Sequence, residues 1–183
     1  MPTVKEYLAR PLADRLARLR TTRDNLAAET RSRSESALAR RPDGRNWSPT
    51  EIVCHLRDVE ELFLVRFLTI LATEDPTILT FSAAPEALAA WRIGGRVEHP
   101  LDPDRWAEER QYQRCDPGLA LTAFARRRRE TLAVLEALTP AEWQRSGRHL
   151  ARGRVALAGW VASLAGHDDN HLAQLRRALD GRA

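Results

Sequence analysis

Hydrophobic residues recur every three or four positions over most of the chain, with arginine and acidic residues between them. This spacing places the apolar side chains along one stripe of an α-helix. It predicts four long amphipathic helices, at about residues 11–39, 48–73, 116–138 and 154–180. We find neither the alternating pattern of strands nor internal repeats. We therefore expect an all-α fold, an antiparallel four-helix bundle formed by a single domain over residues 1–183.

Capping residues mark where the helices begin. Ser48 and Glu51 have the spacing of a capping box, which predicts the start of the second long helix. Thr139 and Glu142 repeat the motif and predict a short helix that ends near residue 147. Asp116, followed by proline, predicts the start of the third long helix.

The connection between the second and third helices, residues 75–116, is interrupted by four prolines and by Gly94-Gly95. We expect short extra helices within it, at about residues 85–91 and 103–113. Because a connection of this length in a compact domain is usually functional, we expect it to cover one end of the bundle and to supply walls of a pocket.

Composition narrows the function classes. The net charge is +4, and Lys5 is the only lysine, so the positive charge is nearly all arginine. Acidic residues are interspersed, and Arg126 to Arg129 run around one helix, so we expect no nucleic-acid partner. No apolar run reaches the roughly 20 residues of a membrane span, and Cys54 and Cys115 form no paired motif. We expect a cytoplasmic protein without a membrane partner.

Two histidines, His167 and His171, lie four residues apart in the fourth helix and so share one face. Their imidazoles can close on one metal ion if a third ligand lies nearby. His55 is the candidate, because it is on the interior stripe of the second helix, and the start of that helix faces the end of an antiparallel fourth helix. The alternative is that all three are separate core histidines, each hydrogen-bonded to a neighbour.

Residues near these histidines are candidates for supporting roles. Asp58 follows His55 by three positions, and we consider it as a catalytic residue or as a solvent-exposed helix position. Asp168 and Gln174 are candidates for hydrogen bonds that orient the metal-binding histidines. The alternative for Gln174, which follows His171 by three positions, is packing at the helix end.

Three further residues are candidates for substrate binding. Arg128 lies near the apolar stripe of the third helix, as an anion anchor or as a side chain that reaches out to solvent. Arg66 is eleven residues after His55, too far for the metal, and we expect it to pair within the bundle or to contact the far end of a ligand. His149 precedes the fourth helix in a loop that can reach the mouth of the bundle.

Two segments resemble motifs of the DinB/YfiT-like superfamily. Residues 46–60 resemble its helix-two motif, and residues 166–175 resemble its closing motif; residues 105–110 and 138–143 are also similar. The resemblance implies a four-helix bundle of up-down-down-up character. It also implies a divalent metal held by His55, His167 and His171.

Members of that superfamily include metal-dependent hydrolases, thiol-dependent S-transferases and a mycothiol-dependent maleylpyruvate isomerase. The resemblance implies a metal-dependent enzyme, and we expect a thiol-dependent S-transferase or isomerase of small molecules. A metal-dependent hydrolase and a non-enzymatic small-ligand or stress-response binding protein are the alternatives. We expect one divalent metal ion, zinc or nickel first, with a low-molecular-weight thiol as co-substrate and a small-molecule substrate. The oligomeric state, a homodimer included, stays open.

Overall fold

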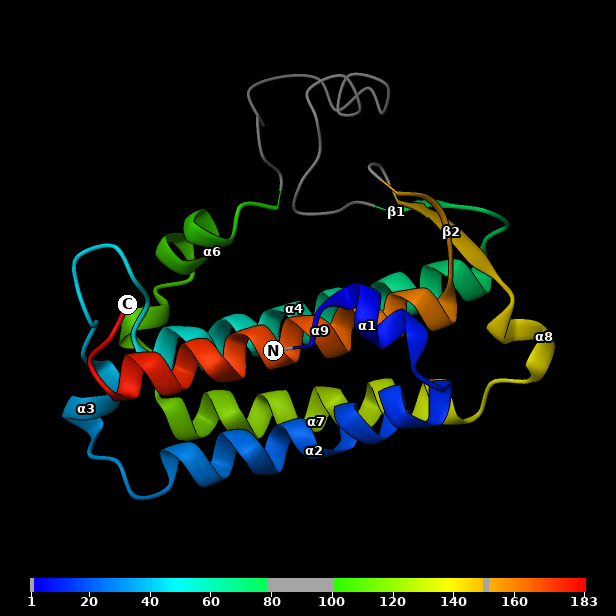
Figure 1. The fold of residues 1–183 in the computed structure, drawn as a ribbon. Helices are drawn as coiled ribbons and strands as arrows, with labels where there is room; N and C mark the ends of the chain where they lie inside the picture. Colours follow the sequence, from blue (N-terminus) through cyan, green and yellow to red (C-terminus); the bar gives the residue numbers. More distant parts are fainter. Residues whose placement is uncertain (1, 79–100, 150–151) are drawn as a thin grey trace, which may run out of the picture.

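The computed structural model describes residues 2–78, 101–149 and 152–183. Within these ranges four long helices lie side by side (Figure 1): α2 (Leu12–Thr30), α4 (Pro49–Ala72), α7 (Pro117–Glu136) and α9 (Leu157–Leu179).

The long helices follow an up-down-down-up course. In Figure 1, α2 and α9 run in one direction, and α4 and α7 run in the other. α4 packs against both α7 and α9, and α2 packs against the same two helices. The predicted fold class, a four-helix bundle of this topology, is confirmed. In the described part of the chain no helix combines the length and the apolar character that a membrane span needs.

The capping motifs explain where the helices begin. At the start of α4 the Ser48 hydroxyl accepts a hydrogen bond from the Glu51 amide at 3.3 Å, and the Glu51 carboxylate accepts one from the Ser48 amide at 2.8 Å. These bonds satisfy amides that have no partner within the helix. Asp116 caps α7 by accepting from the Leu119 amide at 2.7 Å. Both predicted starts are confirmed.

The predicted start of the first long helix near residue 11 is confirmed, since α2 begins at Leu12, but its predicted extension to residue 39 is wrong because α2 ends at Thr30. A separate helix, α1 (Val4–Ala9), precedes α2, and α3 (Glu35–Ala39) follows it. The break has a local cause, because the Ser34 hydroxyl accepts from the Ala37 amide at 3.2 Å and begins a new helix. The three residues before Ser34 are partly or fully exposed and offer no apolar stripe to hold a continuous helix on the core.

The shorter helices also differ from their predicted lengths. The helix expected at 103–113 is α6 (Pro103–Glu109) followed by a 3₁₀ turn, η1 (Tyr112–Arg114). Between them Gln111 has φ 51°, a left-handed conformation that ends an α-helix. The helix expected to reach residue 147 is α8 (Pro140–Trp143). The helix expected at 85–91 lies outside the described residues.

A small three-stranded sheet stands at the end of the bundle where we expected a loop. It consists of β1 (Thr77–Ile78), β2 (Ser146–His149) and β3 (Gly153–Ala156). β1 pairs with β2 in parallel, and β2 pairs with β3 antiparallel. Our expectation of a fold without strands is therefore wrong at this end of the bundle. The last helix begins at residue 157 rather than near 154, because β3 occupies the residues before it. Strands this short are below the length at which alternation can be recognised.

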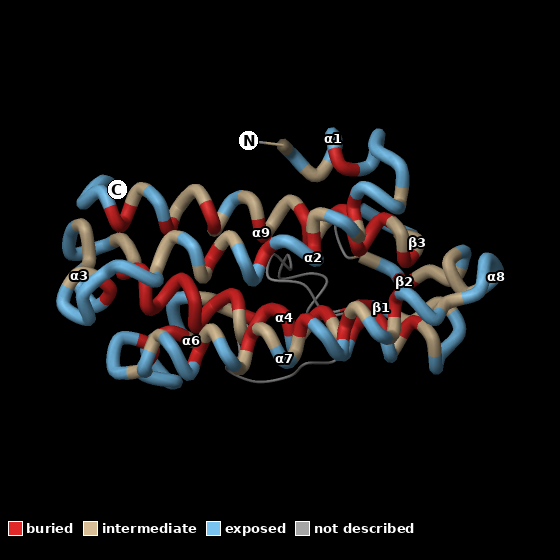
Figure 2. The backbone as a smooth tube through the Cα atoms, turned by 90° about the horizontal axis from the view of Figure 1, so that it is seen from below, coloured by how far each residue is buried: buried red, intermediate tan, exposed pale blue. Residues whose placement is uncertain are grey.

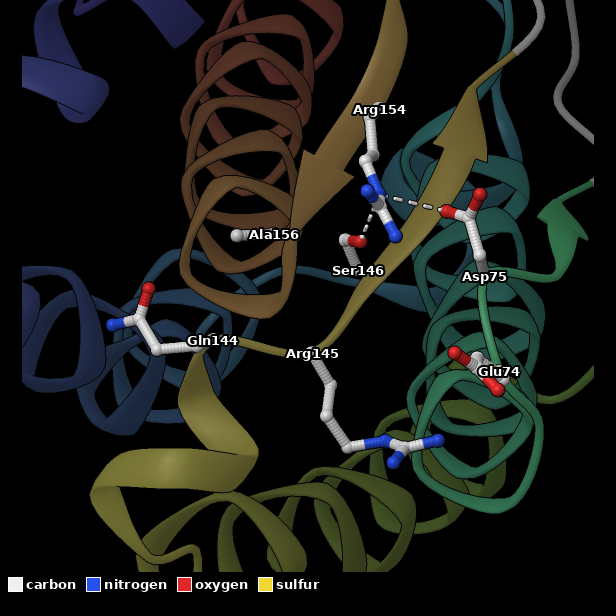
Figure 3. Close-up of a pocket in the computed structure, with 7 residues that line it drawn as sticks. All are labelled: Glu74, Asp75, Gln144, Arg145, Ser146, Arg154 and Ala156. Carbon is white, nitrogen blue, oxygen red and sulfur yellow. Dashed lines mark hydrogen bonds and ion pairs between the residues drawn. The ribbon is translucent and has the colours of Figure 1, made fainter.

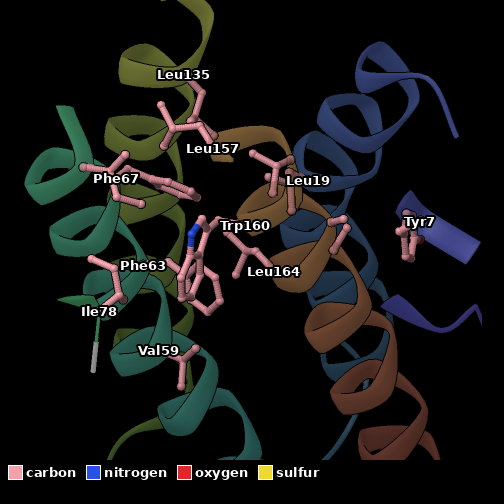
Figure 4. Packing of buried hydrophobic residues seen from close by; sticks show 14 residues of the cluster. Tyr7, Leu19, Val59, Phe63, Phe67, Ile78, Leu135, Leu157, Trp160 and Leu164 are labelled. Atoms are coloured by element: carbon pink, nitrogen blue, oxygen red, sulfur yellow. The ribbon is translucent and has the colours of Figure 1, made fainter. Parts of the chain in front are cut away.

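The core has two main parts. Figure 2 shows that buried residues face inward on all four long helices, and that α4 is buried over much of its length. Near the sheet, Trp160 of α9 lies between the helices (Figure 4), with its ring centroid 6.4 Å from that of Phe63 on α4. At the opposite end, a second cluster includes Ile52 and Leu56 of α4 and Leu175 of α9. This second cluster surrounds the segments that carry the histidines.

Candidate metal centre

His55, His167 and His171 converge between α4 and α9. One nitrogen from each lies within 4.8 Å of the other two. The Nε2 atoms of His55 and His167 are 3.1 Å apart, and the three ring centroids are 4.3 to 5.2 Å from one another. The antiparallel course of α4 and α9 brings the second turn of one helix level with the late turns of the other.

These distances fit a shared metal ion. Two metal–nitrogen bonds of about 2.0–2.1 Å at a tetrahedral angle place their nitrogens about 3.3 Å apart. The 3.1 Å between His55 and His167 is close to that value. The widest separation in the cluster is 4.8 Å, so one imidazole has to move inward for all three to bind the same ion.

Gln174 determines which nitrogen His171 offers. Its side-chain oxygen lies 2.7 Å from Nδ1 of His171. An amide oxygen only accepts hydrogen bonds, so Nδ1 carries the proton and the lone pair of Nε2 can bind a metal ion. Of the two roles considered for Gln174, the structure therefore shows the contact with a histidine.

The surroundings keep the histidines neutral. Burial, with a smaller contribution from His171, lowers the pKa of His55 to about 3. Burial also holds the pKa of His167 well below its usual value, and His171, His55 and Arg128 add to this. For His171, burial lowers the pKa against the opposing effects of Gln174 and Asp168. Metals bind neutral imidazole, so these shifts prepare the cluster for a cation.

A cleft of about 530 Å³ opens onto the histidines. Trp47 forms one wall, with its ring stacked on His171 at 6.4 Å and 15° and tilted against His55 at 4.9 Å. Pro103 and Asp104 at the start of α6 form another. The long connection therefore does supply part of a pocket wall, as its length suggested.

Asp58 does not take the catalytic place that we considered for it. Its side chain is buried and accepts hydrogen bonds from Arg57 (2.7 and 3.1 Å), Arg110 (2.7 Å), Arg127 (3.1 Å) and Tyr112 (2.7 Å). Burial alone would raise its pKa, but the bonds from Arg57, Tyr112 and Arg110 hold the pKa of Asp58 well below its usual range. So stable a carboxylate is a weak base, and it ties α4 to η1 and α7.

Asp168 and Arg128 belong to a buried ion-pair network. Arg128 of α7 donates to Asp168 at 2.7 and 3.2 Å and to Glu60 of α4 at 2.6 Å. Asp168 also accepts from the Thr22 hydroxyl of α2 at 2.6 Å. Asp168 therefore accepts its hydrogen bonds from Thr22 and Arg128. The expected hydrogen bond between Asp168 and a metal-binding histidine is not formed among the described residues. The Arg128 guanidinium donates to two carboxylates, to the Leu19 carbonyl and to the Thr22 hydroxyl, all inside the bundle, so the proposed anchor for a substrate anion is also wrong.

Arg66 and His149 lie at the sheet end of the bundle, away from the histidine cleft. The Arg66 guanidinium is buried over the rings of Phe63 (4.8 Å) and Trp160 (5.6 Å), and His149 in β2 is 5.5 Å from Trp160. Burial, with a contribution from Arg152, lowers the pKa of Arg66 to about 10. Burial, with contributions from Arg152 and Arg66, lowers the pKa of His149 to about 4. The structure does not bring either residue to the metal cluster, so their substrate-binding role remains a prediction.

Several cleft residues were not predicted. Asn170 and Arg177 of α9 line it, as do Arg45 and Asn46 before α4. A signal for two of them was present, because Asn170 and Arg177 continue the stripe of His167, His171 and Gln174 at helical spacing. Arg45 and Asn46 precede the helix, and periodicity carries no information there.

A second cavity, of about 450 Å³, lies beside the sheet (Figure 3). Its polar groups are held by structural contacts. Asp75 accepts hydrogen bonds from Arg148 and Arg154, both at 3.0 Å, and Arg145 donates to the carbonyls of Ile70 and Thr73. It lies at the far end of α4, about 25 Å along the axis from the histidine level. We assign these contacts to joining the sheet to the bundle.

Comparison with known proteins agrees with the fold. A family model described as the DinB superfamily matches residues 18–175. Among solved structures, YfiT from Bacillus subtilis, described as a probable metal-dependent hydrolase with an unusual four-helix bundle topology, superposes with a TM-score of 0.74. The match covers 91% of this chain and 85% of that one at 19% identity, a level that establishes the fold alone. No curated protein matches the sequence. The family match extends over most of the chain, including all three clustered histidines, and this protein therefore belongs to the DinB superfamily.

Proposed function

We propose that the protein is a divalent-metal-dependent enzyme that hydrolyses a small molecule in the histidine cleft. The observation that carries the proposal is the convergence of three neutral imidazoles beside an open cleft. Three protein ligands leave a coordination position for water or substrate, as in catalytic rather than structural sites. The description of YfiT as a probable metal-dependent hydrolase supports this choice of reaction.

The residues of the chain divide the work between holding the ion and shaping the cleft. His55, His167 and His171 would hold the metal, and Gln174 orients His171. A divalent ion supplies Lewis acidity, which lowers the pKa of a bound water towards neutrality. Nitrogen donors suit zinc and nickel. Trp47 covers one side of the cluster and limits the directions from which a substrate can approach.

Thiol-dependent S-transfer is the second candidate, for a specific reason. All three ligands are neutral, so they leave the full charge of a divalent ion uncompensated, and this favours a thiolate in the open position. The described residues that line the cleft include no cysteine. The thiol would therefore enter as a co-substrate of low molecular weight.

A turnover assay separates the two reactions. Metal-loaded protein is incubated with a panel of small esters, amides and electrophiles, with and without a low-molecular-weight thiol, and products are identified by mass spectrometry. We expect hydrolysis without thiol, lost on chelation, restored by zinc or nickel, and absent from His171→Ala. Thiol adducts in place of hydrolysis products would select the second candidate. Turnover that persists unchanged in His171→Ala would overturn both.

A further inference from the structure

Two arginines stand at the mouth of the histidine cleft without a carboxylate partner. Arg45 lies in the turn before α4, and Arg177 lies in the last turns of α9. Most arginines of the described chain donate to carboxylates or carbonyls, but neither of these two guanidiniums makes an ion pair or a hydrogen bond within the described ranges. Arg177 is partly buried, which makes an uncompensated charge there more costly than on an open surface.

The position of Arg177 relates it to the metal cluster. His167, Asn170, His171, Gln174 and Arg177 form one stripe of α9, three or four residues apart along each row, and all line the same cleft. Arg177 is six residues beyond His171, a rise of about 9 Å along the helix axis. That separation matches the length of a small molecule, so one ligand can contact both the cluster and the guanidinium.

The charge of the cleft is positive on balance. Arg45 and Arg177 each contribute one positive charge, Asp104 contributes one negative charge, and the three histidines are neutral. Asp104 forms no ion pair with either arginine in the described part of the chain. Asp43 accepts hydrogen bonds from the backbone amides of Arg45 and Asn46 and from the Asn46 side chain, and the charge of Arg45 contributes to lowering the pKa of Asp43, but the two side chains form no ion pair and Asp43 does not line the cleft. A bound divalent metal would add two further positive charges.

We propose that the cleft selects a small substrate bearing an oxyanion, a carboxylate or a phosphoryl group, which Arg45 and Arg177 bind while the reacting group lies at the histidines. The planar guanidinium donates two parallel hydrogen bonds to such groups. Asn46 and Asn170, which line the same cleft, can bind the uncharged part between the two ends. This inference rests on the proposed function for its reaction, but anion binding can be measured separately.

The test uses succinate and inorganic phosphate as anionic probes and succinamide as the neutral counterpart of succinate. Binding is measured by titration calorimetry to the zinc-loaded protein, to Arg177→Gln and Arg45→Gln, and to Arg33→Gln as the control. Arg33 is exposed, lies between α2 and α3, and is outside the cleft. Circular dichroism checks that each variant folds. Because Arg45 and Arg177 lie on different elements, a folding defect in one variant leaves the other available for the test.

We expect the dissociation constant of the tighter anion to rise by about tenfold or more in Arg177→Gln, with a smaller rise in Arg45→Gln and none in Arg33→Gln. Succinamide should bind more weakly than succinate throughout. Whether succinate or phosphate binds more tightly identifies the oxyanion. Equal anion affinity in wild type and Arg177→Gln, or no anion binding by the wild type, would overturn the inference.

Metal content of the same samples keeps this test separate from the proposed function. A wild-type protein that binds no metal defeats the proposed enzyme, and the anion titration on that metal-free protein still reports on Arg45 and Arg177. A wild-type protein that binds metal but whose anion affinity does not depend on Arg177 defeats only the substrate class.

Discussion

Removing Arg128 tests whether the buried ion pairs stabilise the bundle. The side chain is 3% exposed and bonds to Glu60 and Asp168, which are 0% and 1% exposed, so Arg128→Met leaves two carboxylates inside the bundle without a counter-charge. It also removes the donor to the Leu19 carbonyl at 2.9 Å. Breaking a buried pair by removing one partner costs about 3–5 kcal/mol. We expect the free energy of unfolding to fall by about that amount, a large part of the typical 5–15 kcal/mol.

Urea unfolding followed by circular dichroism at pH 7 measures this loss. The control is Arg126→Met, because Arg126 is 65% exposed and its nearest carboxylate, on Glu130, is 3.9 Å away. We expect the control to lose no more than about 0.5 kcal/mol. Adding Glu60→Gln and Asp168→Asn to Arg128→Met should recover part of the loss, since this network then contains no buried charge. A loss below about 1 kcal/mol in Arg128→Met would refute the reasoning.

Four further predictions concern the histidines and a helix start. Because burial lowers the pKa of all three histidines, each stays neutral to a lower pH than free imidazole. Bound metal should therefore be retained at about pH 6.5 and be lost only at lower pH. Metal content after dialysis across a pH series measures this, and loss of half the metal at or above about pH 6.5 would contradict the prediction. Without metal, the unfolded chain binds more protons than the folded one below about pH 6.5, so in that range the free energy of unfolding should decrease as the pH is lowered. Gln174→Ala should weaken metal binding about 10- to 100-fold with helical content unchanged, as read from competition with a chromogenic chelator, and unaltered affinity counts against its orienting role. Ser48→Ala should cost about 1–2 kcal/mol in urea unfolding, whereas Ser36→Ala, at an exposed position, should cost much less; equal losses would show that the capping box is not the cause.

Local features of the sequence predicted the bundle well. The Ser48 and Asp116 caps and the apolar stripes involve residues within one or two helical turns, and both caps are found where they were expected. The meeting of His55 with His167 and His171 needed only one further step, the antiparallel pairing of α4 and α9. The break before α3 was missed because the apolar stripe of α2 was extended through the polar residues that precede the Ser34 cap.

Contacts between distant segments were not predictable in the same way. Helical periodicity places Asp58 near the face of His55, but it does not say that Arg110 and Arg127 from other elements lie against its carboxylate. The partners of Asp168, Thr22 and Arg128, are likewise on α2 and α7. The sheet pairs Ile78 with His149 across about 70 residues of chain, and no local pattern encodes that contact. Spacing identified the face of each helix, and only the folded structure identified its neighbours.

The central claim is that His55, His167 and His171 bind one divalent ion together. The most direct measurement is the metal content of purified protein after loading with zinc or nickel and removal of free ion, determined by plasma mass spectrometry for wild type and for the His55→Ala/His171→Ala double variant. Both histidines face the shared cluster, with ring centroids 4.5 Å apart. We predict one ion per chain in the wild type and almost none in the double variant, with the helical circular dichroism spectrum retained. Equal metal content in a folded double variant would contradict the account.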